Sequence, residues 1–92
     1  MHKVTAKEKK QLMKRGHSLQ PVVMIGRNGL TAAVHAEIET ALIAHELIKI
    51  KVASHDRALR TALFSDIAAR HQAALVHTIG LVAIFYRPNE AS

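Results

Sequence analysis

Hydrophobic and polar positions follow two different periods along this chain of 92 residues. Two segments carry apolar side chains three or four positions apart, which is the spacing of a helix that buries one face. A third segment, near the N-terminus, opens with a helix-capping signature. Four short segments are either mostly apolar or alternate apolar with polar side chains, as strands do. The pattern predicts helices at about residues 6–15, 31–45 and 57–72 and strands at 21–25, 47–53, 74–79 and 82–87.

The ends of the predicted helices carry local signals. Thr5 and Glu8 are spaced as a capping box, in which the two side chains satisfy free backbone donors at a helix start. Gly16 can end the first helix, because glycine tolerates the left-handed conformation that follows many helices. Thr31 and Asp56 can cap the second and third helices.

The order of elements, αβαβαββ, predicts one domain over residues 1–92 with a short tail from about residue 89. Helical crossovers favour parallel strands, so we expect mostly parallel pairing. Gly80-Leu81 suits a type II′ hairpin that adds one antiparallel neighbour. The apolar run at 21–25 is typical of a strand covered by helices on its faces. The expected fold class is α/β, in a two-layer α+β form with a four-stranded mixed sheet.

The charge of the chain is strongly uneven. Thirteen Lys and Arg against seven Asp and Glu give a formal net charge of +6 and a pI of about 10.2. Residues 1–30 hold seven of the basic residues and one acid, Glu8, so they carry the whole excess; six basic and six acidic residues follow. Solubility would be served by spreading the charge, so this polarity indicates a polyanionic partner.

Most of this charge falls on the first predicted helix. Four lysines lie within a stripe of about 60° on one side of it: Lys3, Lys7, Lys10 and Lys14. Because only Glu8 is interleaved, ion pairs along the helix do not explain the stripe, and we favour a surface that follows phosphates over a merely solvated face. Arg15 extends this basic surface. For Lys49 and Lys51, contact with the partner and protection of an exposed strand face remain equal alternatives.

The segment Gly26, Arg27, Asn28 and Gly29 forms a loop between a predicted strand and helix. Two glycines permit a tight turn and a close approach to a phosphate, and the helix start behind them presents free amides and a positive dipole. The Arg27 guanidinium fits phosphate oxygens or base edges. A plain connector is the alternative, since this glycine spacing is common; the place of the loop within the basic third favours binding.

Other chemistry finds little support in the residues. The absence of cysteine excludes disulfides, thiolate nucleophiles and Cys-based zinc sites, and favours the cytoplasm. The longest apolar run, residues 81–85, is too short to span a membrane. The seven histidines show no metal-ligand spacing, and no nucleophile elbow, Walker motif or acid-base pair is present. We therefore expect no enzyme activity, no cofactor and no metal.

The aromatic residues are few: Phe64, Phe85 and Tyr86. Recognition of RNA bases on a sheet needs exposed stacking rings, and Phe64 is better explained as core of the third helix. Contact through backbone phosphates and overall shape is the better expectation.

Several motifs in order resemble one known family. The motifs are residues 19–31, which contain the glycine loop, residues 45–52 and residues 82–88. Together with the basic first helix they are similar to the CRM domain, the chloroplast RNA splicing and ribosome maturation family, in its stand-alone bacterial YhbY-like form. The resemblance implies a fold similar to the C-terminal domain of bacterial translation initiation factor three. It also implies RNA binding through Gly26, Arg27, Asn28, Gly29 and the neighbouring basic surface, and association with precursors of the large (50S) ribosomal subunit.

The sequence therefore predicts a non-enzymatic, cytoplasmic RNA-binding protein that assists assembly of the large ribosomal subunit. Ribosomal RNA in precursor particles is the expected partner; a membrane or a small-molecule substrate is not expected, and the chain is expected to be a monomer. The alternative is an adaptor that docks an acidic protein through its basic N-terminal face. The candidate RNA-binding residues are Lys7, Lys10, Lys14, Arg15, Gly26, Arg27, Asn28, Gly29, Lys49 and Lys51.

Overall fold

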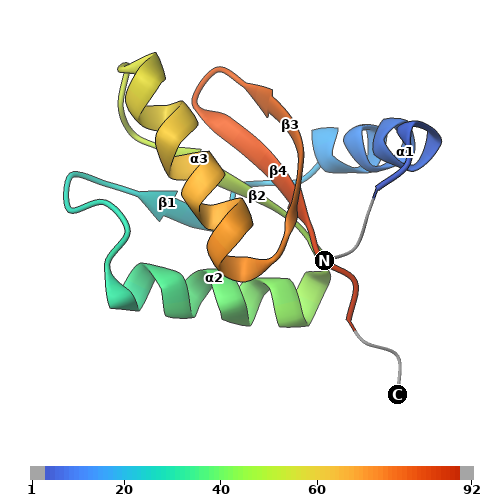
Figure 1. The fold of residues 1–92 in the computed structure, drawn as a ribbon, viewed down its shortest axis with the longest axis horizontal. Coiled ribbons are helices and arrows are strands. Elements are labelled where there is room, and N and C mark those ends of the chain that lie inside the picture. Colours follow the sequence, from blue (N-terminus) through green and yellow to red (C-terminus); the bar gives the residue numbers. More distant parts are fainter. Residues whose placement is uncertain (1–3, 90–92) are drawn as a thin grey trace.

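The computed structural model describes residues 4–89 and shows three helices and four strands in the predicted order (Figure 1). The elements are α1 (Ala6–His17), β1 (Val23–Ile25), α2 (Ala32–His45), β2 (Leu47–Val52), α3 (Arg57–His71), β3 (Ala74–Ile79) and β4 (Val82–Tyr86). The four strands form one mixed sheet, so the predicted α+β class is confirmed.

The order of strands in the sheet is β1-β2-β4-β3. β1 pairs with β2 in parallel, whereas β4 is antiparallel to both β2 and β3. The expectation of mostly parallel pairing was therefore wrong. The helical crossovers do make β1, β2 and β3 run in the same direction, but the final hairpin inserts β4 between β2 and β3. The hairpin itself is confirmed: Ile79 pairs with Val82 around a two-residue turn, and Gly80 has a φ of 55°.

Helices pack on both faces of the sheet. The larger core lies between the sheet and the helices α2 and α3. Its buried residues are Val23, Ile25, Ile38, Leu42, Ile48, Ile50, Val52, Phe64, Ile67, Ala73, Ala83 and Phe85. On the other face, Leu12 of α1 packs with Leu47, Val76 and Ile84. α1 thus adds a third, partial layer to the two that the sequence predicts.

The three helices begin where the sequence predicts. Thr5 accepts a hydrogen bond from the Glu8 amide at 3.1 Å, and Glu8 accepts one from the Thr5 amide at 3.4 Å, which completes the capping box. Thr31 and Asp56 accept amide hydrogen bonds as the caps of α2 and α3. None of the helices within residues 4–89 is long and apolar enough to cross a membrane.

The first helix ends later than predicted. α1 continues to His17, and its C-cap is Ser18 in a right-handed conformation, so Gly16 is not the terminator. Gly16 instead lies buried against the sheet: a Cβ built on it would stand 2.5 Å from Cδ1 and 2.9 Å from Cγ2 of Ile84. Glycine is therefore present at this position because α1 approaches β4 too closely for a side chain.

β1 is shorter and more open than predicted. The strand begins at Val23 rather than Pro21 and forms an edge of the sheet. Val23 and Ile25 are buried beneath α2 and α3, but Met24 between them is 59% exposed. Burial on both faces was therefore wrong for this strand. α1 covers the sheet over β2, β3 and β4 and leaves the other side of β1 open.

Gly16→Val should lower the free energy of unfolding by about 2–3 kcal/mol. The added side chain must displace Ile84 in a close-packed contact, and β-branching further disfavours the helix. Urea unfolding followed by circular dichroism measures the change. Ala69→Val introduces the same side chain at an exposed position of α3 and should change stability by less than about 1 kcal/mol. Equal stability of the two variants would contradict the close approach of α1.

Candidate nucleic-acid interface

The lysine stripe lies on the exposed side of α1. Leu12 and Gly16 lie on the opposite side of the helix and pack against the sheet. Lys7, Lys10 and Lys14 are all exposed and line one shallow hollow along the helix; Lys3 falls outside the described residues. The structure therefore places these three ammonium groups together, as the helical spacing predicts, on a surface that solvent and a large ligand can reach.

The Gly26 to Gly29 loop is an open turn directly before α2. The Gly29 amide donates a 3.1 Å hydrogen bond to the Gly26 carbonyl, and Arg27 and Asn28 between them are exposed. Gly29 has a φ of 69°, a conformation that favours glycine, whereas Gly26 needs no positive φ. No atom lies within 4 Å of a Cβ built on either glycine, so the loop offers its backbone to a partner.

The start of α2 adds positive potential beside this loop. α2 has no acidic residue in its first turn, and the Thr31 hydroxyl accepts from the Val34 amide at 3.1 Å. The partial positive charge of the helix N-terminus is therefore not neutralised by a carboxylate of its own first turn. The arrangement fits an anion held between the loop backbone, the Arg27 guanidinium and the first amides of α2.

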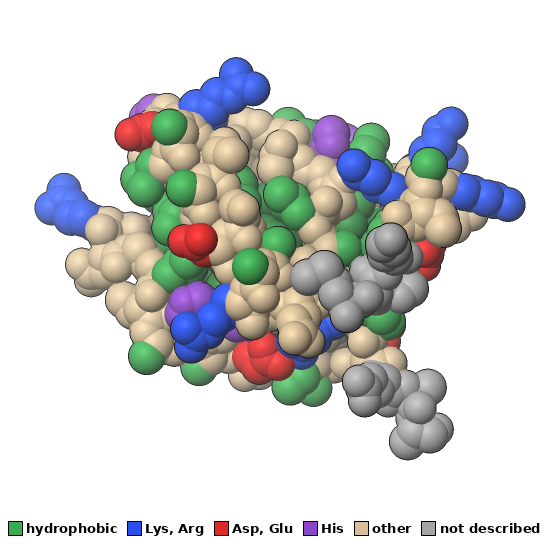
Figure 2. All heavy atoms as spheres, viewed as in Figure 1, with side chains coloured by type: hydrophobic (Ala, Val, Ile, Leu, Met, Phe, Trp, Pro, Cys, Tyr) green, Lys and Arg blue, Asp and Glu red, His purple; other side chains and the backbone are tan. Residues whose placement is uncertain are grey.

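The loop and α1 lie at opposite ends of the molecule, whose extents are 36 × 25 × 21 Å (Figure 1). Figure 2 shows basic side chains projecting at both ends of the long axis, over α1 and over the loop that follows β1. The structure therefore does not bring the lysine stripe and the glycine loop together. A partner that contacts both must extend along the length of the protein.

Lys49 and Lys51 lie between these two ends. Both belong to β2, and their pairing with Ile84 and Met24 places them on the face of the sheet that α1 partly covers. The Lys49 ammonium donates to the His17 carbonyl at the end of α1, at 3.4 Å. Lys51 lies beside the exposed Met24, close to the strand that leads into the loop. Arg15 lines a hollow together with Lys49, so it also faces this side.

The acidic residues of the second and third helices lie on the other side of the sheet. They are Glu37, Glu39, Glu46 and Asp66. α2 and α3 cover the face opposite the two lysines of β2, so these carboxylates point away from the basic surface. Of the six basic residues after residue 30, Lys49 and Lys51 lie on the opposite face, whereas Arg57, Arg60 and Arg70 belong to α3, so the side of α2 and α3 is mixed in charge.

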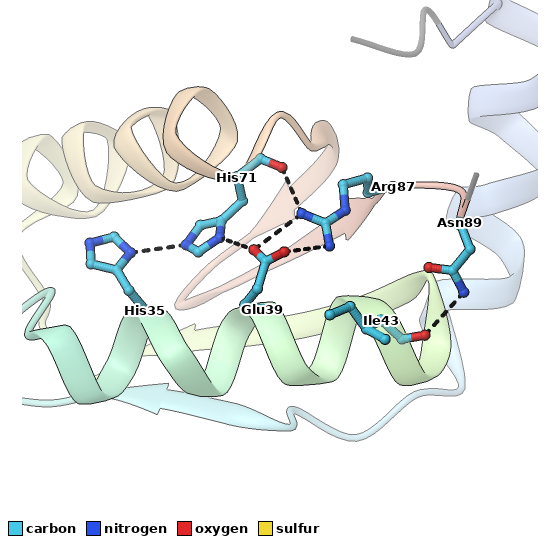
Figure 3. Close-up of polar contacts among 6 residues, drawn as sticks. All are labelled: His35, Glu39, Ile43, His71, Arg87 and Asn89. Atoms are coloured by element: carbon cyan, nitrogen blue, oxygen red, sulfur yellow. Dashed lines mark hydrogen bonds and ion pairs between the residues drawn. The ribbon is translucent and has the colours of Figure 1, made fainter.

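A partly buried polar cluster connects α2, α3 and the residue that follows β4 (Figure 3). His71 is 5% exposed, and its Nδ1 lies 2.8 Å from Oε2 of Glu39. Arg87 donates to both carboxylate oxygens of Glu39, at 2.7 and 3.1 Å, and to the His71 carbonyl at 3.1 Å. His71 Nε2 lies 2.9 Å from Nδ1 of His35. With Glu39 ionised, His71 donates to it and accepts from His35.

The charges of this cluster shift the acidity of two groups. Hydrogen bonds from Arg87 and then His71 lower the pKa of Glu39 from its ordinary value of 4.5 to about 2. Burial, followed by the positive charge of Arg70, lowers the pKa of His35 below its usual 6.5. No group of three His, Asp or Glu side chains within residues 4–89 is arranged to hold a metal ion. The cluster acts as a structural tie between elements.

Sequence reasoning missed this cluster. His35 and Glu39 are four positions apart on one helix, a spacing that places them on the same face. His71 and Arg87, however, come from segments 32 and 48 residues from Glu39, and no local pattern connects them.

The chain belongs to the CRS1/YhbY (CRM) domain family, whose model matches residues 4–87. A Haemophilus influenzae protein named "RNA-binding protein" is 48% identical over 98% of this chain and 91% of the relative. A Pseudomonas aeruginosa protein named a probable RNA-binding protein is 45% identical, over 94% of this chain and 83% of the relative. The solution structure of a Staphylococcus aureus protein, described as a candidate RNA-binding protein, matches with a TM-score of 0.85 and 26% identity. That match covers 97% of this chain and 93% of the neighbour. The predicted family is confirmed.

Glu39→Gln should weaken the dependence of stability on acid pH. Because the pKa of Glu39 is lower in the folded protein, its contribution is complete above pH 4.5 and is lost as the pH falls toward about 2. Solvent screening of this partly exposed carboxylate limits the contribution to about 1–2 kcal/mol. Urea unfolding across this pH range measures the effect.

Glu37→Gln, on the exposed side of the same helix, is the matched control and should keep the wild-type pH profile. If Glu39→Gln and wild type lost the same free energy of unfolding between pH 4.5 and 2, Glu39 would not be the responsible group.

Proposed function

We propose that this protein binds RNA, with the Gly26 to Gly29 loop at one end and the lysine stripe of α1 at the other. The observation that carries the proposal is the arrangement of charge: α1 and the lysines of β2 lie on the face of the sheet opposite the carboxylates of α2 and α3, and basic side chains project at both ends of the molecule. The lysine stripe together with Lys49 and Lys51 forms a basic strip along this face. Such a strip, with a loop that exposes its backbone, fits a polyanion whose charges are spaced along its length. The names of the relatives support RNA as that polyanion.

The recognised feature is the phosphate backbone of a structured RNA. Phe64 and Phe85 are buried in the core and Tyr86 is partly buried against the layer of α1, so these rings form no stacking platform. Lysine ammonium groups act as point charges along a backbone and read no base sequence. An extended, folded RNA presents phosphates along a rigid surface, which suits two contact sites at opposite ends of a 36 Å molecule.

The RNA we propose is ribosomal RNA within precursors of the large subunit, bound by the monomer in the cytoplasm. The family supports this proposal. The chain belongs to the CRM domain family, and its motifs resemble the stand-alone bacterial form, for which the resemblance implies association with precursors of the large subunit. The residues suggest no reaction on that RNA, since the clustered His and Glu side chains tie the fold together and face away from the basic strip. Binding without catalysis is the role that we assign.

Arg27→Ala should weaken binding to a transcribed fragment of large-subunit ribosomal RNA. The loss of one phosphate contact reduces the magnitude of the negative slope of log affinity against log salt by about 0.7–0.9. Lys10→Glu combined with Lys14→Glu should weaken binding independently, because the two sites are far apart and their effects add. Filter binding between about 50 and 200 mM salt measures both.

Arg70→Ala removes one exposed positive charge from the last turn of α3, outside the proposed surface, and serves as the control. Wild-type affinity in the triple variant that combines Arg27→Ala, Lys10→Glu and Lys14→Glu, with an intact circular dichroism spectrum, would disprove the proposed surface. Absence of any complex at low salt would instead favour the alternative function, an adaptor for an acidic protein.

In cells, the protein should sediment with precursors of the large subunit, and the triple variant should shift to the top of the gradient because it loses its RNA contacts. Gradient sedimentation, with crosslinking and sequencing of the bound RNA, measures this association. A wild-type protein bound mainly to RNA other than ribosomal precursors would contradict the assembly role while leaving RNA binding in place.

A further inference from the structure

A pocket lies between the first turns of α3 and the β3–β4 hairpin, away from the loop and from α1. Figure 1 shows the start of α3 and the hairpin turn at the same end of the molecule. The pocket has a volume of about 430 Å³. Arg57, Arg60 and Thr61 of α3 line one wall, and Thr78 of β3 lines the other. Neither the sequence pattern nor the family resemblance singled out these residues.

The two arginines give the pocket a positive charge. No carboxylate within residues 4–89 forms an ion pair with Arg57 or Arg60, and the nearby Asp56 carboxylate accepts the Leu59 amide at 3.1 Å as the cap of α3. The Arg60 Nη1 donates to the Ser54 carbonyl at 2.9 Å, which holds that guanidinium in place. Arg57 is exposed and has no hydrogen-bond partner among the described residues. Both guanidinium groups can therefore donate to an added anion.

The remaining walls suit a sugar and a base better than a bare anion. Thr61 and Thr78 are exposed residues, and their hydroxyls have no hydrogen-bond partner within residues 4–89. Leu75, which is 38% exposed, lines the pocket together with the nearly fully buried Phe64 and supplies most of its small apolar surface. A pocket with two guanidinium groups, two hydroxyls and an apolar floor matches the parts of one nucleotide: phosphate, ribose hydroxyls and base.

The position of the pocket relates it to the glycine loop. β1, which leads into the loop, and β3, which leads into the hairpin, form opposite edges of the sheet and run in the same direction. Both therefore end at the same end of the sheet. Three strand spacings separate these edges, a distance of about 14 Å. One RNA strand can cross that distance in a few nucleotides.

We propose that the Arg57–Arg60 pocket is a second RNA subsite, which takes a single nucleotide of an unpaired segment next to the RNA held by the glycine loop. The proposal rests on RNA binding as the function of the protein. Unlike the basic strip, this subsite holds a base and a ribose as well as a phosphate. It therefore adds a preference for single-stranded RNA at this end of the molecule.

Arg57→Gln with Arg60→Gln should weaken binding to the same ribosomal RNA fragment about fivefold to twentyfold and reduce the magnitude of the salt slope by about 0.7, the value for one single-strand phosphate contact. Glutamine at position 60 keeps a donor for the Ser54 carbonyl. Arg57→Gln alone breaks no contact in the fold and should give part of the effect. Arg70→Gln, an exposed arginine in the last turn of α3, is the matched control and should change affinity by less than about twofold.

The outcomes separate the two proposals. If wild type binds the RNA and Arg27→Ala weakens it, but Arg57→Gln with Arg60→Gln behaves as Arg70→Gln does, the pocket is not a subsite although RNA binding stands. If wild type binds no ribosomal RNA, the proposed function itself fails.

Nuclear magnetic resonance of the labelled full chain tests the chemistry of the pocket. Adenosine 5′-monophosphate should shift the amide signals of Thr61, Thr78 and Gly80, and the double glutamine variant should abolish these shifts. Inorganic phosphate at the same concentration should shift them much less. Equal affinity for the two probes would overturn the nucleotide assignment, because the hydroxyls and the apolar floor would then contribute nothing.

Discussion

The pairing of β2 with β1 on one side and β4 on the other determines where the charged residues of this protein lie. Within β2, Ile48, Ile50 and Val52 face α2 and α3 in the larger core, and the alternation of the strand forces Lys49 and Lys51 onto the opposite face. A shift of the register by one residue would bury both ammonium groups, so the core fixes the basic strip. β1 is the edge strand that pairs in parallel with β2, so the glycine loop that follows β1 lies at one edge of the sheet.

Local signals in the sequence predicted the elements well and their arrangement less well. The caps at Thr5, Thr31 and Asp56 and the hairpin at Gly80 depend on neighbouring residues, and they were all correct. The insertion of β4 between β2 and β3 depends on pairing between distant segments, which periodicity does not report. Gly16 shows the same limit, because a glycine near a helix end can terminate the helix or admit a neighbouring strand, and only the contact with Ile84 separates these roles.

The candidate site likewise has features that follow from the local sequence and features that depend on long-range packing. The lysine stripe on α1 and the exposed, left-handed Gly29 follow from helical spacing and glycine chemistry, and the structure shows both geometries. Their separation along a 36 Å axis was not predictable, because it depends on α1 packing against β2, β3 and β4, far from β1. The cluster around His71 is a further long-range feature, in which Arg87 and His71 pair with Glu39 and join α2, α3 and the residue that follows β4.

The central claim is that one RNA lies along the basic side of the molecule and contacts both of its ends. Ultraviolet crosslinking of the full chain to ribosomal RNA, followed by mass spectrometry of the linked peptides, tests this claim most directly. We predict crosslinks in α1 around Lys10 and Lys14 and in the loop around Arg27 within the same complex. Crosslinks confined to the exposed side of α2, around Glu37, would contradict the account.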